Sequence, residues 1–212
     1  MSHQRAKDEL NGDRMSRAVL VLLAGYGLIT FGWRPFLQWH RTGDFGVRVS
    51  GHSSATAKVA STLMVSGSII GLRGVAAVSC GRRSHYTLSP VLRTIGLVAL
   101  GAAVALTTRA QLDLGTSWRI GVDESERTQL VTEGSFAAVR NPIFSGMALA
   151  VVGAGVVVPS PATLLATAAL LTGVEIQVRA VEEPYLLETH GDAYRAYARR
   201  TGRFVPGIGL LH

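Results

Sequence analysis

Apolar residues gather in long runs along this chain, and short polar segments separate the runs. In the first half the runs cover residues 18–33, 55–79 and 91–108. A helix needs about 20 residues to cross a bilayer, so we expect three spanning helices here. The first should end at Trp33-Arg34-Pro35, where an interfacial aromatic, a charge and a helix stop coincide. Residues 1–17 are expected to form a short polar tail and residues 36–54 a polar loop.

Two further apolar runs, residues 144–158 and 162–178, are joined by Pro159-Ser160-Pro161. Two prolines around a serine favour a tight reversal, so these helices should be antiparallel neighbours. The segment after Glu182 is polar, with a helical stretch expected near residues 185–200. The pattern predicts an all-α integral membrane protein with about five transmembrane helices, a C-terminal helical hairpin and a cytoplasmic catalytic tail. We divide it into a three-helix transmembrane platform (residues 1–110) and a C-terminal module of loop, hairpin and tail (residues 111–212).

Composition supports a membrane protein, because 48% of the 212 residues are hydrophobic and only 17% are charged. The single cysteine, Cys80, excludes an internal disulfide and a cysteine-based metal site. Six scattered histidines show no metal-binding spacing, so we expect no metal. The net charge is +7, and the basic residues are spread over every loop without interleaved aromatics. This pattern indicates that they set the orientation in the membrane and contact lipid headgroups, and it does not favour nucleic-acid binding. Most Lys and Arg residues fall on the side of the C-terminal tail, which favours a cytoplasmic tail.

Charged residues are concentrated where the hairpin's second helix ends. Glu175, Arg179, Glu182 and Glu183 follow one another at spacings that place Arg179 on one face with all three carboxylates. Charge at membrane depth is costly, so these groups should face the bundle interior and pair. Either they form a salt-bridged helix end, or they line a polar pocket for a zwitterionic or cationic ligand.

The tripeptide Arg140-Asn141-Pro142 precedes the first hairpin helix. The proline biases Asn141 away from helical geometry, so the chain should turn here. The N-terminal amides of the following helix could hold an anionic group, and Phe144 offers a ring one turn in. The alternative is an ordinary N-cap at a helix entry.

These motifs together resemble the isoprenylcysteine carboxyl methyltransferase family and the wider group of small membrane methyltransferases that includes phospholipid N-methyltransferases. The resemblance covers residues 114–206, nearly half the chain. Its ordered motifs are LGxxW at 114–118, LVTxGxF at 130–136, RxPxFxG at 140–146, RxxEE at 179–183, and then Gly191, Tyr194, Tyr197, Arg203 and Pro206.

Two features leave the methyl acceptor open. The carboxyl methyltransferases usually have Arg-His-Pro where this chain has Arg140-Asn141-Pro142, and the Asn-Pro form looks more like phosphatidylethanolamine methyltransferases. The stretch from Gly191 to Pro206, by contrast, looks like bacterial carboxyl methyltransferases. The resemblance therefore implies a lipid-like or other apolar acceptor, methylated either on an isoprenylcysteine-like carboxylate or on a lipid amine.

The resemblance also implies S-adenosyl-L-methionine as cofactor and a multi-pass protein whose active site faces the cytoplasm. Arg140, Asn141 and Glu183 would be the catalytic positions. The implied cofactor contacts are Glu182 and Glu183 to its positive groups; Arg140 or Arg179 to its carboxylate; Asn141, Pro142 and Phe144 around adenosine and sulfur; and Tyr194, Tyr197 and Arg203 in a lid.

Two other hypotheses remain at this point. Membrane sterol reductases share part of the C-terminal pattern, which would make the chain an NADPH-dependent reductase, although their greater length and helix number count against it. The other alternative is a membrane scaffold without catalysis, in which Glu182 and Glu183 only anchor a helix.

Overall fold

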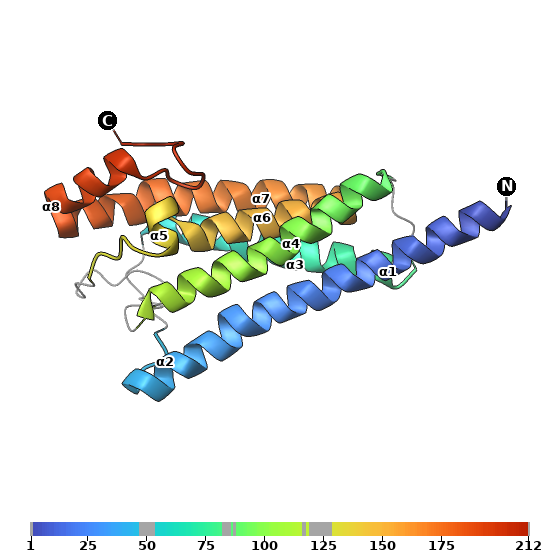
Figure 1. Ribbon diagram of the computed structural model, residues 1–212, viewed down its shortest axis with the longest axis horizontal. Helices are drawn as coiled ribbons and strands as arrows, with labels where there is room; N and C mark the ends of the chain where they lie inside the picture. Colours follow the sequence, from blue (N-terminus) through green and yellow to red (C-terminus); the bar gives the residue numbers. More distant parts are fainter. Residues whose placement is uncertain are drawn as a thin grey trace.

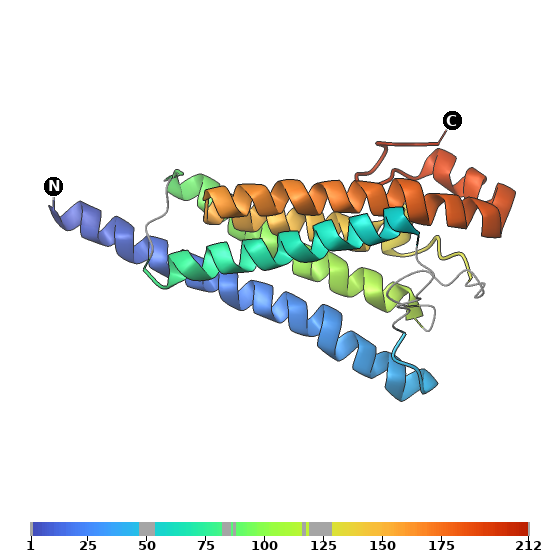
Figure 2. The same cartoon turned by 180° about the vertical axis from the view of Figure 1, so that it is seen from behind.

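The computed structural model describes residues 2–46, 54–81, 86, 88–115, 118 and 129–211, with side chains from residue 14 onward. Within these residues the regular elements are helices, which lie side by side in an elongated bundle (Figures 1 and 2). Two π-helical turns, Leu28–Trp33 and Val178–Glu182, carry one helix into the next. The α-helices are α1 (Ser2–Gly27), α2 (Arg34–Thr42), α3 (Ala55–Ser79), α4 (Pro90–Asp113), α5 (Ser135–Ala138), α6 (Pro142–Val157), α7 (Pro161–Gln177) and α8 (Glu183–Arg200).

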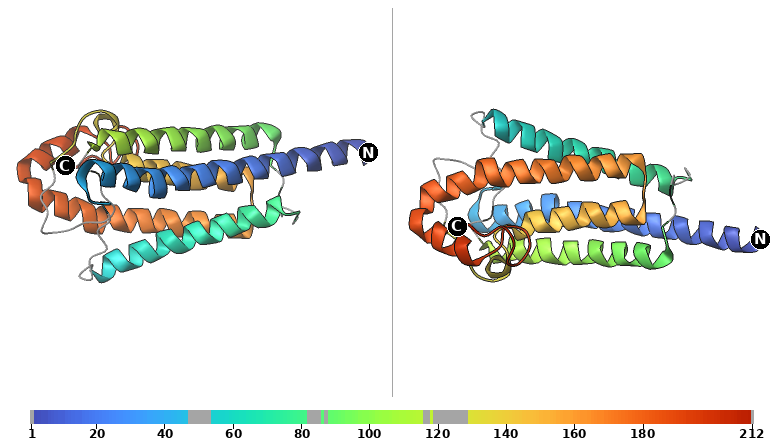
Figure 3. Two further views of the ribbon diagram at one scale, coloured as in Figure 1. Left: turned by 90° about the horizontal axis from the view of Figure 1, so that it is seen from below. Right: turned by 90° about the horizontal axis from the view of Figure 1, so that it is seen from above.

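The bundle is built from two close helix pairs, α3 beside α7 and α4 beside α6 (Figure 3). Glycines permit the close approach, because a Cβ on Gly153 would lie 2.7 Å from the Gly96 carbonyl oxygen, and one on Gly67 3.0 Å from that of Ala166. Where α1, α3, α4 and α6 meet, Val19, Val75 and Leu100 are fully or almost fully buried. The first three long helices thus pack directly on the hairpin.

The hairpin predicted from Pro159-Ser160-Pro161 is confirmed by the packing of α6 on α7. Ser160 begins α7 with a capping box: its Oγ accepts from the Thr163 amide, and the Thr163 Oγ1 accepts from the Ser160 amide. The capping box thereby satisfies amides at the start of α7 that have no partner within the helix.

Among the described residues, four helices are long and apolar enough to cross a membrane: Arg14–Thr42, Ala55–Ser79, Pro90–Asp113 and Pro161–Arg200. A fifth apolar helix, Pro142–Val157, is shorter. The expected all-α integral membrane class is confirmed, whereas five complete crossings and the cytoplasmic position of the tail stay predictions. The two chain ends lie at opposite ends of the bundle (Figure 1).

Two expected boundaries were wrong. The polar N-terminal segment is helical from Ser2, and the helix does not stop at Trp33-Arg34-Pro35. Pro35 falls in the first turn of α2, directly after the π-helical turn Leu28–Trp33 that carries α1 into α2. The first helical run therefore continues to Thr42 and ends at Gly43, whose φ of 77° is a common helix terminator. Part of the expected 36–54 loop is thus helical.

Candidate functional site

Three segments far apart in sequence meet at the end of the bundle that holds α8 (Figure 1). These are the bend before α6, the start of α8, and the tail after α8. The bend is non-helical as predicted: Val139 is extended and Asn141 has φ −128° and ψ 59°. Pro142 then opens α6, and it is buried.

Glu183 joins the three segments through its carboxylate. Its Oε1 accepts from Arg140 Nη2 at 2.7 Å and from Arg203 Nε at 2.9 Å, and its Oε2 accepts from Arg203 Nη2 at 2.8 Å. The side chains of Glu183, Arg140 and Arg203 are 7%, 1% and 13% exposed. Hydrogen bonding to Glu183 raises the pKa of the Arg203 guanidinium, so this arginine stays charged. Two cations share one anion, which leaves the trio with a net positive charge.

Arg140 is held on several sides, yet one of its donors is free. Its Nη1 donates to the carbonyls of Ala198 (3.0 Å) and Thr201, and its Nη2 also reaches the Gly209 carbonyl at 3.0 Å. The buried Nε has no hydrogen-bond partner in the part of the chain that is described. An orphaned charged donor is costly when buried, and an anionic ligand group would satisfy it.

The tail after α8 runs across the bend before α6, and backbone hydrogen bonds join the two segments. The Arg140 amide donates to the Gly202 carbonyl at 2.8 Å, and the Asn141 amide donates to that of Arg203 at 3.1 Å. Asn141 Nδ2 adds a third bond, also to the Arg203 carbonyl. Asn141 occupies the N-cap position of α6, but its side chain bonds the tail and not the first amides of the helix.

Tyr194 and Tyr197 lie beneath the tail rather than on its surface. Their residues are 1% and 3% exposed, and their rings pack edge to face with centroids 6.1 Å apart. The Tyr197 hydroxyl donates to the Phe136 carbonyl at 2.6 Å, which ties α8 to α5. Both tyrosines pack against protein, and the expected role of this pair in a lid over the cofactor stays a prediction.

The two adjacent acids have different surroundings. Glu183 is buried between two arginines, whereas Glu182 is only half-buried and accepts from Gln177 Nε2 at 3.3 Å. The Gln177 Oε1 is buried and lacks a partner among the described residues. Glu182 and Gln177 thus form a second polar group on the same helical run, and of the twin acids only Glu182 is partly accessible to a ligand.

Arg179 does not share a buried face with Glu183, contrary to the sequence expectation. It pairs with Glu175 one turn earlier, and these side chains are 58% and 46% exposed. The α-helical spacing argument fails because Val178–Glu182 is π-helical, so residues after the turn are rotated from their α-helical positions. Arg203, from the tail, takes the place beside Glu183 that Arg179 was expected to fill.

The remaining motif residues on α6 have distinct surroundings. Phe144 is half-buried one turn into the helix. Gly146 faces α4, since a Cβ there would lie 2.1 Å from Thr107 Oγ1. In RxPxFxG the final glycine therefore serves helix packing, while Arg140 and Asn141 serve the bend.

Sequence reasoning missed two groups that fix the surrounding segments. Asp113, at the end of α4, accepts from the Ser135 amide at 2.8 Å and pairs with Arg109, so it holds α5 against α4. Buried Arg34 donates to the Gln111 and Gly115 carbonyls and stacks 4.7 Å from the Trp118 ring. A signal existed for the second group, because Trp118 ends the LGxxW motif. Thr116 and Ser117 of that motif lie outside the described residues.

Comparisons with known proteins agree with these motifs. Residues 91–193 match the family model described as phospholipid methyltransferase. Protein-S-isoprenylcysteine O-methyltransferase B of Arabidopsis thaliana is 29% identical over 130 residues, which are 60% of this chain and 64% of that protein. The chain therefore spans a little under two thirds of this curated relative.

A solved structure shows the same fold. The eukaryotic intramembrane Ras methyltransferase ICMT (isoprenylcysteine carboxyl methyltransferase) superposes with a TM-score of 0.53, covering 92% of this chain and 70% of that one at 22% identity. The expected resemblance to small membrane methyltransferases is confirmed. The role of each site residue is not tested by these likenesses.

Proposed function

We propose that this relative of the isoprenylcysteine and phospholipid methyltransferases is itself a membrane methyltransferase that uses S-adenosyl-L-methionine and acts on a lipid-like or other apolar acceptor. The observation that carries the proposal is the trio Arg140–Glu183–Arg203, which joins the RxPxFxG bend, the RxxEE helix and the tail. Residues 91–193 match a methyltransferase family model, and they include both of these motifs.

The residues present fit this cofactor. Its amino-acid end carries a carboxylate and an ammonium, which need a cation and an anion close together. Arg140 supplies a buried Nε without a protein partner, within a trio of net positive charge. We assign the ammonium to Glu182, which is the half-buried one of the two adjacent carboxylates. We therefore assign the cofactor carboxylate to Arg140 and not to the exposed Arg179.

Phe144 and Asn141 complete the proposed site. Phe144, half-buried at the start of α6, offers a ring face to adenosine or to the sulfonium. Asn141 and Pro142 hold the bend that places this ring relative to Arg140. Glu183 acts as a positioning residue, because both of its oxygens are already bound by arginines.

The chemistry asks little of the protein beyond positioning. The bound cofactor would supply an activated methyl group, and transfer requires the acceptor atom to lie in line with that group and the sulfur. An ionised carboxylate acceptor needs no base, while an ammonium acceptor must first lose its proton. The family match names phospholipids and the plant relative names isoprenylcysteine, so we propose these two acceptor classes.

We further propose that the site faces the cytoplasm, where this cofactor is made, and that the acceptor enters sideways from the bilayer. The excess of Lys and Arg on the side of the C-terminal tail supports this orientation. Residues 1–110 would then be the platform and 111–212 the methyltransferase module, with α3 and α4 packed on α7 and α6.

Ligand-induced stabilisation of the purified full chain tests the proposal. S-adenosylhomocysteine should raise the melting temperature, by a shift that grows with its concentration, and NADPH should not. A shift with NADPH alone would favour the reductase, and no shift with either would favour a scaffold. Methyl transfer to an S-prenylated N-acetylcysteine or to phosphatidylethanolamine then identifies the acceptor.

A matched pair of variants tests the assignment of Glu182. Glu182→Gln should weaken S-adenosylhomocysteine binding roughly 10-fold or more, because it removes a charged hydrogen-bond acceptor. Glu188→Gln, an exposed position on α8, should leave the affinity unchanged. Equal affinities for both variants would contradict the assignment of the cofactor ammonium to Glu182.

A further inference from the structure

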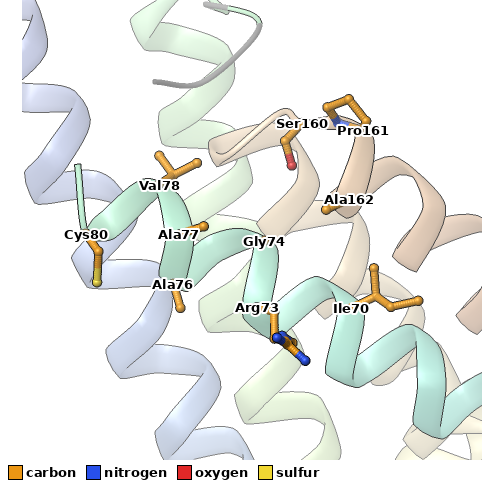
Figure 4. A pocket seen from close by; sticks show the side chains of 10 residues that line it. All are labelled: Ile70, Arg73, Gly74, Ala76, Ala77, Val78, Cys80, Ser160, Pro161 and Ala162. Carbon is orange, nitrogen blue, oxygen red and sulfur yellow. The ribbon is translucent and has the colours of Figure 1, made fainter. Parts of the chain in front are cut away.

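A groove of about 850 Å³ lies between α3 and the turn that joins α6 to α7 (Figure 4). It is at the end of the bundle opposite α8, far from the candidate site (Figure 1). Its walls are small or apolar, with Gly74 and Ala77 from α3 and Pro161 and Ala162 from the start of α7. The hydroxyl of Ser160 also lines it, but that oxygen already accepts from the Thr163 amide.

Arg73 is the charged side chain among the lining residues. It is exposed, and it makes no hydrogen bond or salt bridge within the part of the chain that the structure describes. Arg73 lies six residues before the end of α3, which is about 9 Å of helix rise. At that depth an arginine extends its guanidinium toward the headgroup level, where it can pair with an anionic headgroup.

We propose that this groove binds an anionic phospholipid, with the headgroup phosphate on Arg73 and an acyl chain along the apolar wall. The charge and the wall support the same occupant, because a guanidinium pairs with phosphate and small apolar residues accept a hydrocarbon chain. The groove lies on α3 and α7, which are both long and apolar enough to span the bilayer, so lipid would have direct access to it.

A second copy of the chain fits the groove less well. A two-fold symmetric contact places the same patch on both partners, which would bring two unpaired Arg73 guanidiniums toward each other. Like charges in a poorly solvated contact repel. A phospholipid supplies the opposite charge instead.

Lipid titration of the purified full chain, followed by native mass spectrometry, tests the proposal. Phosphatidylglycerol should bind roughly five-fold more tightly than phosphatidylcholine with the same acyl chains, as expected for one arginine at a membrane surface. Arg73→Gln should remove this preference, and Arg73→Lys should keep it. Lys58→Gln, an exposed cation near the other end of α3, is the matched control and should bind both lipids like the wild type.

A larger side chain in the groove tests the proposal that an acyl chain lies along the apolar wall. Ala77→Leu should weaken both lipids while leaving the charge of Arg73 intact. Wild-type lipid preference in Arg73→Gln would overturn the proposal, and so would a wild-type dimer that Ala77→Leu dissociates. The inference does not rest on the proposed function, since stabilisation by S-adenosylhomocysteine is a separate readout that Arg73→Gln should leave unchanged.

Discussion

Two ion pairs on one helical run, only a few residues apart, have opposite characters. Glu175 and Arg179 pair locally across one turn and remain about half exposed. Glu183 lies four residues beyond Arg179, is buried, and binds Arg140 and Arg203 from other segments. The local pair orders only its own turn, whereas the long-range trio holds the bend and the tail together. A cluster of charged residues in the sequence therefore locates the region of the site, but it does not show which of the ion pairs holds the segments of the site together.

The two sets of ion pairs should contribute differently to stability, because water surrounds the first pair and is excluded from the second set. An exposed pair gains little because water screens it and because ordering two long side chains costs entropy. Breaking a buried pair leaves an uncompensated charge in a poorly polarisable interior, and for Glu183 it leaves two. Three variants test this comparison.

Glu183→Gln should have the largest effect. It leaves Arg140 and Arg203 without their shared anion, which costs about 3–5 kcal/mol and lowers the melting temperature on the order of 10 °C. Hydrogen–deuterium exchange should increase at the amides of Arg140, Asn141 and Arg203, which the tail protects. A variant that melts and exchanges like the wild type would show that the trio does not hold the tail.

Tyr197→Phe should have an intermediate effect on the same region. It removes one partly buried hydrogen bond, from the tyrosine hydroxyl to the Phe136 carbonyl. We expect a loss of about 1 kcal/mol, and a fall in melting temperature of roughly 2–4 °C. Increased exchange limited to α5 and the end of α8 would locate the defect, and an unchanged profile would rule out this tie.

Arg179→Gln should have the smallest effect, with less than about 0.5 kcal/mol lost and S-adenosylhomocysteine affinity retained. Thermal melting and ligand titration measure the two quantities, and Glu175→Gln is the matched partner variant. If Arg179→Gln lost affinity for S-adenosylhomocysteine and Glu175→Gln did not, Arg179 would be a cofactor-binding residue. The contrast between the exposed pair and the buried trio would then be wrong.

The sequence was sufficient for much of the local structure. Apolar run length predicted the long helices, Pro159-Ser160-Pro161 predicted the hairpin, and Pro142 predicted the turn at Asn141. It failed at residues 1–17 and at Pro35, where polar composition and a proline were interpreted as a tail and a helix stop. Pro35 directly follows the π-helical turn Leu28–Trp33, and the helical run continues past it, so the presence of a proline alone does not end a helix.

Chain chemistry alone thus determined the apolar helices, their reversal, and the set of charged residues around the bend, because these depend on neighbours in sequence. The tertiary structure decided the partners. Glu183 pairs across 43 residues with Arg140 and across 20 with Arg203, and the π-helical turn before Glu183 departs from the helical spacing assumed for Arg179. Spacing along a helix predicts only ion pairs between residues three or four positions apart. A charge that is buried between packed segments must instead pair with an opposite charge that the fold brings next to it, however distant in sequence.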